Sequence, residues 1–285
     1  MTVPRTDPEP RTLRELLAFY RDAGVDAAIT ETPLDRFADE APRRTAQQSS
    51  LPAAPARDRE ATYVQSRPAP DGSEPAAPPQ AAETAVMAAR EAAKSAQSLD
   101  ALRQLLENFE GCLLRTTATR LVFADGNPQA RVMFVGEAPG RDEDIAGLPF
   151  VGRSGKLLDR MMAAIGLDRG TVYIANVVPW RPPGNRTPTP QETAICLPFI
   201  RRQIELADPD ILVCLGQPAT QTLLGTKEGI TRTRGRWFKY HTGKREIRAL
   251  ATYQPAFLLR SSLQKRLAWR DFLALKKALS ETATA

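Results

Sequence analysis

Strand-like and helix-like segments alternate along residues 131–279, and this alternation restricts the possible fold more than any other feature of the sequence. Short apolar runs predict four strands, at 131–136, 171–178, 210–216 and 247–253. Between and after these strands, apolar residues at helical spacing predict helices at 155–166, 190–206, 217–224 and 262–279. Such alternation predicts a parallel sheet covered on both faces. We therefore expect an α/β fold with three layers, α/β/α, around a short, mainly four-stranded parallel sheet.

The residues before this region have a different composition. Residues 1–40 include a capping box at Thr12 followed by an apolar stripe, which predicts an N-terminal helical segment. Residues 41–84 contain eight prolines among many Ala, Ser and Gln residues. A segment of this kind buries too little apolar area to offset the entropy of ordering it, so we expect a disordered linker. The remaining residues, 85–285, would form the main domain.

Charge and cysteine content restrict the partners and the compartment. Residues 1–84 hold 10 Lys/Arg against 14 Asp/Glu, whereas residues 85–285 hold 29 against 19. The main domain is therefore basic, as expected of a protein that contacts phosphates. The sequence has no run of eighteen apolar residues, and its three cysteines argue against a disulfide framework. We expect a cytoplasmic monomer with free thiols and no membrane contact.

A glycine-rich turn follows the first predicted strand. It comprises Gly136, Glu137, Ala138, Pro139 and Gly140, and is followed by the acids at 142–144 and by Phe150. In open α/β sheets, ligands bind at the carboxyl ends of the strands, which is where this turn lies. A generic nucleotide-binding domain is disfavoured, because the Gly155-Lys156 pair is followed by Leu157 and not by Ser or Thr.

This segment resembles the first motif of the uracil-DNA glycosylase superfamily in its family-four form. Residues 174–188 are similar to the family's second strand and the Arg-Pro-Pro loop after it, and residues 253–260 are similar to its motif B. The similarity extends over roughly residues 98–280. It implies a DNA-repair enzyme that flips uracil out of DNA and hydrolyses the N-glycosidic bond, releasing free uracil and leaving an abasic site.

The chain departs from the family pattern at two places. Family-four enzymes hold an iron–sulfur cluster with four cysteines; Cys112 and Cys196 match two of them, but Arg115 and Trp180 occupy the other two positions. We therefore expect a cluster-less relative with no metal and no cofactor, similar to the cluster-less alphaproteobacterial enzymes. The motif B histidine is replaced by Gln254. This replacement keeps open an alternative, a protein that binds uracil-containing or abasic DNA with little or no turnover.

The resemblance implies a role for each residue of the base pocket. Phe150 would stack on the extruded base and Asn176 would read its edge, while the main chain of Gly136, Ala138, Pro139 and Gly140 would hold uracil. Structural alternatives are a core phenylalanine and an asparagine that closes a turn. Among the carboxylates, Glu137 and Glu143 are the first candidates for positioning the attacking water. Gln254 would donate a neutral hydrogen bond in place of the family histidine.

Two segments are expected to contact DNA. The proline-rich loop after the second strand would grip phosphates through Arg181, Asn185 and Arg186. In motif B, Phe257 and Leu258 would form an apolar wedge beside the cation Arg260, although the same residues could simply start a core helix. A basic stretch at 232–245 is a further candidate for contact with the DNA backbone.

Overall fold

The computed structural model describes residues 79–282. The expected segment 1–40 and most of the expected linker 41–84 lie outside the described residues. Helix α2 (Pro79–Ser95) begins inside the range assigned to the linker, so the main domain starts earlier than residue 85. Within the described range, no helix has both the length and the apolar character needed to cross a membrane.

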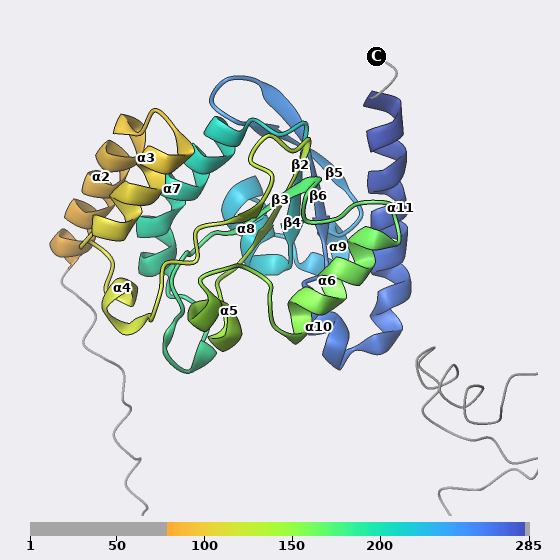
Figure 1. Ribbon diagram of the computed structural model, residues 1–285, viewed down its shortest axis with the longest axis horizontal. Helices are drawn as coiled ribbons and strands as arrows, with labels where there is room; N and C mark the ends of the chain where they lie inside the picture. Colours follow the sequence, from red (N-terminus) through yellow and green to blue (C-terminus); the bar gives the residue numbers. More distant parts are fainter. Residues whose placement is uncertain (1–78, 283–285) are drawn as a thin grey trace, which may run out of the picture. The chain divides into compact units, whose positions relative to one another are not determined.

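A sheet of six strands lies at the centre, in the order β1-β3-β2-β4-β6-β5 (Figure 1). Its strands are β1 (Asp125–Gly126), β2 (Val132–Gly136), β3 (Val172–Asn176), β4 (Ile211–Leu215), β5 (Trp237–His241) and β6 (Glu246–Thr252). The central four are parallel to one another, and β1 and β5 run antiparallel at the two edges. The four parallel strands confirm the predicted sheet, and the two edge strands are additions to it.

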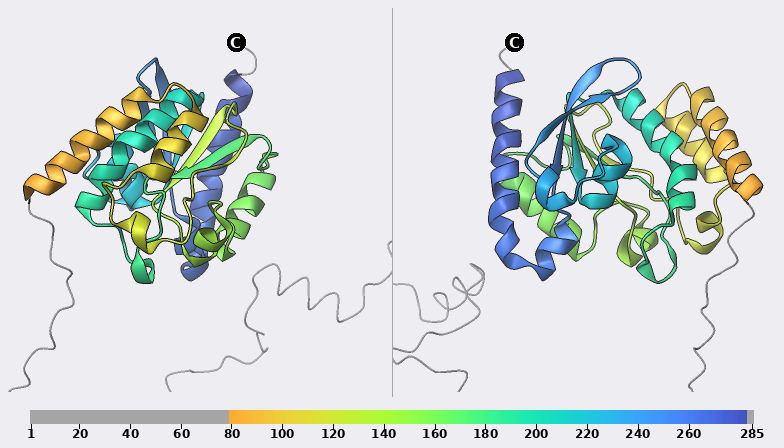
Figure 2. Two further views of the ribbon diagram at one scale, coloured as in Figure 1. Left: turned by 60° about the vertical axis from the view of Figure 1, so that its left-hand side comes forward. Right: turned by 180° about the vertical axis from the view of Figure 1, so that it is seen from behind.

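Helices cover both faces of this sheet, which confirms the three-layer prediction. One face packs against α2, α3 (Leu99–Asn108), α7 (Pro190–Ala207) and α8 (Gln217–Leu224), and the other against α6 (Arg153–Ala163) and α11 (Lys265–Thr282) (Figures 1 and 2). Shorter helices occur in the connections: α4 (Leu114–Thr117), α5 (Arg141–Ala146), η1 (Pro183–Asn185), α9 (Ile230–Thr233), α10 (Pro255–Arg260) and η2 (Ser262–Gln264).

Strand β2 shows why the sheet needs two apolar layers. Its side chains alternate between the faces, with Met133 and Val135 in one hydrophobic cluster and Val132 and Phe134 in the other. All of these side chains are buried. A strand covered on both sides must be apolar at every position, which explains the continuous apolar run in the sequence.

The basic stretch 232–245 is mostly neutralised by the fold. Arg234 binds the buried Asp271, and Arg245 binds Asp208 and Asp210, each at 3.0 Å. Lys239 pairs with Glu246 across the β5–β6 hairpin. These ion pairs help to attach the hairpin to the sheet, and contact of this stretch with the DNA backbone stays a prediction.

Candidate active site

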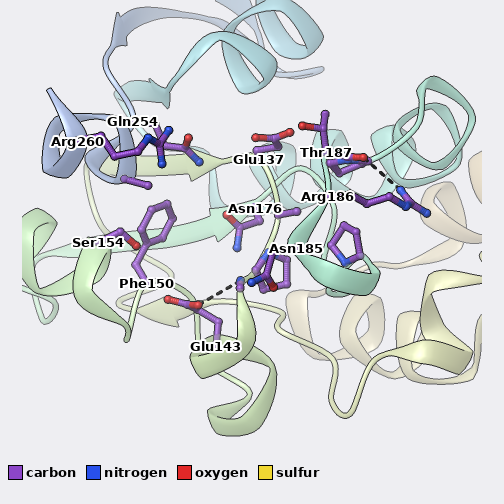
Figure 3. A pocket seen from close by; sticks show the side chains of 16 residues that line it. Glu137, Glu143, Phe150, Ser154, Asn176, Asn185, Arg186, Thr187, Gln254 and Arg260 are labelled. Carbon is purple, nitrogen blue, oxygen red and sulfur yellow. Dashed lines mark hydrogen bonds between the residues drawn. The ribbon is translucent and has the colours of Figure 1, made fainter. Parts of the chain in front are cut away.

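A cavity of about 440 Å³ opens where the parallel strands end, between the turn after β2, the loop after β3 and the start of α10 (Figure 3). Most of the site residues expected from the sequence line it: Glu137, Ala138, Pro139, Gly140, Glu143, Phe150, Asn176, Asn185, Arg186, Gln254 and Arg260. The sheet thus brings together three segments that together span more than a hundred residues of the chain.

Gly136 allows the two key side chains of the cavity to approach each other. It pairs with Asn176 in the parallel β2–β3 ladder. A Cβ atom at Gly136 would lie 2.5 Å from Cζ of Phe150 and 2.5 Å from Oδ1 of Asn176. Any larger residue would push the ring or the amide out of place, so Gly136 acts by providing space.

Two buried oxygen atoms in the cavity make no hydrogen bond within the described residues. They are Oδ1 of Asn176, whose side chain is only 4% exposed, and Oε1 of Glu137. An unsatisfied buried acceptor costs about 1–3 kcal/mol, and native folds rarely retain one without a reason. Both residues line the cavity (Figure 3), where a bound molecule could supply the missing donors.

Burial also changes the ionisation of Glu137. Desolvation raises the pKa of its carboxyl group above the ordinary value of 4.5, and a hydrogen bond with Thr187 offsets only part of this rise. Such a carboxylate is a better proton acceptor than an exposed one. Glu137 is therefore suited to hold and polarise a water molecule in the cavity.

Glu143 occupies a different position from Glu137, although both line the cavity. Its Oε2 accepts from the N–H of Gly140 at 3.1 Å, and its Oε1 accepts from the N–H of Gly152 at 3.0 Å. The carboxylate therefore ties the start of α5 to the start of α6. These contacts favour a role for Glu143 in holding the loop.

The same contacts reduce the number of main-chain donors available to a ligand. The N–H of Gly140 is used by Glu143, and Pro139 has no N–H. The whole turn from Gly136 to Gly140 was expected to offer main-chain donors to a ligand. Only the N–H groups before Pro139 are left for this role.

The acidic segment after the turn forms the short helix α5, anchored by Asp144. This buried carboxylate accepts hydrogen bonds from the main-chain N–H of Thr119 at 2.8 Å, the hydroxyl of Thr119 at 2.9 Å and the N–H of Arg120 at 3.2 Å. Gly147, with φ of 73°, ends the helix in the left-handed conformation.

The loop after β3 is stiffened by two arginines. Nε of Arg181 donates to Oδ1 of Asn185 at 2.7 Å. Arg186 forms a two-pronged contact with Glu192, with N–O distances of 2.8 and 2.7 Å, and Glu192 also caps the start of α7. Arg186 and Asn185 are exposed at the cavity mouth, whereas Arg181 lies outside the residues that line it.

The motif B segment forms helix α10, with Gln254 at its N-cap position. The Gln254 side chain makes no capping hydrogen bond, and it points into the cavity (Figure 3). Leu258 is fully buried against Tyr253 and Ala268, so the expected DNA contact of Leu258 is wrong: helical spacing turns this side chain inward. Phe257 is half-buried and packs on the Tyr253 ring, with centroids 5.0 Å apart.

The residues at the four cysteine positions do not fit a four-thiolate cluster. Cys112 and Cys196 are both buried, and the hydrogen bond from Cys196 lowers the pKa of the Cys112 thiol. Trp180 is 2% exposed, and Nε of Arg115 donates to the Glu107 carbonyl at 2.9 Å. Over residues 79–282, no three His, Cys, Asp or Glu side chains are grouped to hold a metal ion.

The cavity residues that were not anticipated from the sequence include two with hydroxyl groups, Ser154 and Thr187. Thr187 stands in the proline-rich loop and hydrogen-bonds with Glu137. Ser154 lies in the first turn of α6, two residues after Gly152. Small hydroxyl residues are common in such turns, so their residue type alone gives no signal.

Comparisons with known proteins agree with this geometry. The family model described as the uracil DNA glycosylase superfamily matches residues 123–273. The Type-4 uracil-DNA glycosylases of Archaeoglobus fulgidus and Thermotoga maritima are each 42% identical to the chain, over 167 and 164 residues. Both alignments cover 57% of this chain and 84% of the relative. The Type-4 enzyme of Sulfurisphaera tokodaii is 37% identical over 185 residues, which is 63% of this chain and 84% of the relative.

Proposed function

Because the chain belongs to the uracil-DNA glycosylase superfamily, we propose that it excises uracil from DNA by hydrolysing the bond between the base and its deoxyribose. The products would be free uracil and an abasic site, which makes the protein a hydrolase of base excision repair. The observation that carries this proposal is the pair of unpartnered buried oxygens, on Asn176 and Glu137, in one cavity beside an aromatic ring.

The uracil base would enter the cavity after extrusion from the DNA. Phe150 would stack on its face, a contact worth about 1–3 kcal/mol for any base. Asn176 would supply the selectivity. Its Oδ1 would accept from uracil N3–H, which satisfies the buried acceptor, and its NH₂ group would donate to O4. Cytosine presents an acceptor at N3 and a donor at C4, so both polar groups of Asn176 would be left unpaired.

Glu137 would hold the water that attacks the sugar carbon. As the bond breaks, the sugar gains positive charge, and the adjacent carboxylate would stabilise that charge while it orients the water. Glu143 would act indirectly by fixing the loop between α5 and α6. Negative charge developing on uracil would meet the main-chain amides before Pro139 and the amide of Gln254. Gln254 would donate a neutral hydrogen bond there, where the family pattern has a histidine.

The exposed side chains at the mouth would contact the DNA backbone. Arg186 and Arg260 would bind phosphates, with Asn185 between them and Arg181 holding Asn185 in place. Phe257 would contribute apolar surface. We further propose that the protein works as a cytoplasmic monomer without an iron–sulfur cluster, which is supported by the two-thiol composition of the cluster positions and by its three free cysteines.

Release of free uracil is the direct test. The full chain is incubated with matched oligonucleotides that contain uracil or cytosine at one position, both single-stranded and paired, and the released base is measured by chromatography. We expect uracil from the uracil substrates and no cytosine. Tight binding to uracil-containing DNA without release of the base would instead support the binding-protein alternative, which the replacement at Gln254 favours.

A further inference from the structure

Phe150, the proposed stacking ring, has an unfavourable backbone conformation. Its φ is 56°, in the left-handed region, where an L-residue with a side chain is destabilised by roughly 1–2 kcal/mol. A residue held in this way needs surrounding contacts that determine its conformation.

Arg169, in the turn between α6 and β3, binds the main chain at this point. Its guanidinium donates to the carbonyl oxygen of Phe150 and, at 3.1 Å, to the carbonyl oxygen of Pro149. The same group is held from two other elements: Asp159 of α6 accepts from Nε at 2.9 Å, and Asp125 of β1 accepts from Nη1. One side chain thus fixes two successive carbonyls against the sheet edge and a helix.

The Phe150 carbonyl packs closely against Gly155 of α6. A Cβ atom at Gly155 would lie 1.6 Å from that oxygen, so the carbonyl is packed directly onto the first turn of α6. On the other side, the ring fills the space left by Gly136. The carbonyl and the ring of Phe150 are thus both fixed by close packing, and a change in the backbone torsions of this residue would disturb both contacts.

We propose that Arg169 is a positioning residue for base stacking: it holds Phe150 in the left-handed conformation that places the ring in the uracil cavity. Arg169 lies outside the residues that line the cavity, so it would not touch a base bound there. The planar fork of arginine is required, because a lysine ammonium cannot span two carbonyls and two carboxylates together. This inference rests on the proposed excision of uracil for its activity readout only.

A double-mutant cycle tests the coupling in the full chain. The variants are Arg169→Met, Phe150→Ala and the two combined, each assayed for kcat/KM of uracil release. Arg169→Met should lower kcat/KM by about tenfold or more, since small misplacements of a binding group have large effects on rate. The double variant should lose no more than Phe150→Ala alone. Losses that multiply in the double variant, or wild-type activity of Arg169→Met, would refute the proposal.

Arg202→Met is the matched control. Arg202 of α7 also binds a main-chain carbonyl oxygen, that of Ala96, through two nitrogens and pairs with the carboxylate of Glu205, but it lies outside the residues that line the cavity. Its loss removes the same kind of anchor away from the cavity. We expect its kcat/KM to stay within about twofold of wild type.

A second readout does not depend on catalysis. With 4-fluorophenylalanine at position 150, the ¹⁹F resonance should shift or broaden in Arg169→Met and remain unchanged in Arg202→Met. If the wild-type protein released no uracil, the proposed function would fail while this measurement still decided the role of Arg169. If Arg169→Met did not fold, Asp159→Asn would loosen the same guanidinium and should move the same resonance. An unchanged resonance in the folded variant would overturn the proposal.

Discussion

The cavity proposed to bind the base contains two buried oxygen atoms without hydrogen-bond partners among the described residues. Oδ1 of Asn176 and Oε1 of Glu137 are buried without partners among the described residues, which is unfavourable for the free protein. A ligand that supplies donors relieves this cost, and one that supplies acceptors increases it. Selectivity therefore comes from the penalty of a wrong match more than from the strength of a right one.

Changing Asn176 to Asp should abolish most uracil excision. The carboxylate places an acceptor where the amide NH₂ group faces uracil O4, so one hydrogen bond becomes a repulsion. We expect the barrier to rise by at least about 2 kcal/mol, measured as kcat/KM for uracil release.

Asn127→Asp is the control for this charge change. Asn127 lies in the exposed turn after β1, and its variant should keep wild-type rates. If Asn176→Asp also excised uracil at the wild-type rate, the base would have to be recognised by the main chain or by the loop around Asn185. Phe150→Ala should weaken excision without changing the preference for uracil, because stacking does not distinguish base edges.

Changing Glu137 to Gln should lower activity and raise stability. Burial raises the pKa of Glu137, so the folded state favours the neutral acid, and this contribution to stability is lost as the pH rises through that pKa. A neutral amide avoids the loss at pH 7, so the melting temperature should increase. Activity should fall on the order of 10²-fold, because the amide cannot accept a proton.

The pH dependence of wild-type activity also tests the role of Glu137. Its activity should fall as the pH is lowered through the raised pKa of Glu137, which lies above 4.5. Glu205→Gln removes a carboxylate that pairs with Arg202 outside the cavity. This variant should show the same fall in activity at low pH, the acid limb of the profile, as the wild type. An unaltered acid limb in Glu137→Gln would assign the water to another group.

Asn176 was predictable because it ends a predicted strand, and Phe150 because it lies in the motif that follows one. It assigned Leu258 to the DNA because the segment Pro255 to Arg260 carries both apolar and basic residues. Which of these residues face inward depends on the orientation of α10 about its own axis. Packing against α6 and α11 sets that orientation. The roles of Glu143 and Arg169 also depended on backbone contacts that residue types do not reveal.

At the scale of elements, the proposed absence of a cluster depends on Trp180, which stands where the resemblance places one of the family's cysteines. Trp180 is among the largest fully buried side chains and packs in the same hydrophobic cluster as Cys112 and Cys196. Trp180→Ala should therefore reduce the free energy of unfolding by about 3–5 kcal/mol, as for other large core truncations.

Denaturant unfolding at equilibrium measures this effect. Trp269→Ala is the control, since Trp269 is 42% exposed and its loss should change stability far less. The purified protein should also be colourless and free of iron when prepared without oxygen. Stoichiometric iron, or a Trp180→Ala variant as stable as wild type, would contradict the view that packing has replaced a cluster here.

The central strands and main helices were predictable because each has a strong apolar pattern. The edge strands were not. β1 has only two residues, and β5 mixes Trp237 and Phe238 with exposed cations, as a strand with one free edge can. Helix α5 was missed because its sequence is acidic and its stability comes from Asp144 binding Thr119, a contact between segments 25 residues apart.

At the scale of the molecule, residues 79–282 contain the whole cavity and both hydrophobic layers. Deleting residues 1–78 should therefore leave uracil excision within about tenfold of the full chain. The deletion must stop before α2, because this helix packs against α7 and the Ala96 carbonyl that follows it binds Arg202. A larger loss of activity with an unchanged circular dichroism spectrum would show that the N-terminal residues complete the site.

The two antiparallel edge strands also have a consequence for how the protein behaves in a crowded solution. A parallel sheet with bare edges offers unpaired main-chain groups to any neighbouring strand. Here one edge ends in the two-residue strand β1, and the other carries Lys239, whose side chain is 83% exposed and paired with Glu246. A neighbouring chain would have to pair with a strand too short to extend or approach an outward-pointing charge. Both edges of the sheet therefore disfavour pairing with a strand of another chain. This would protect the basic protein from aggregation while it moves along DNA.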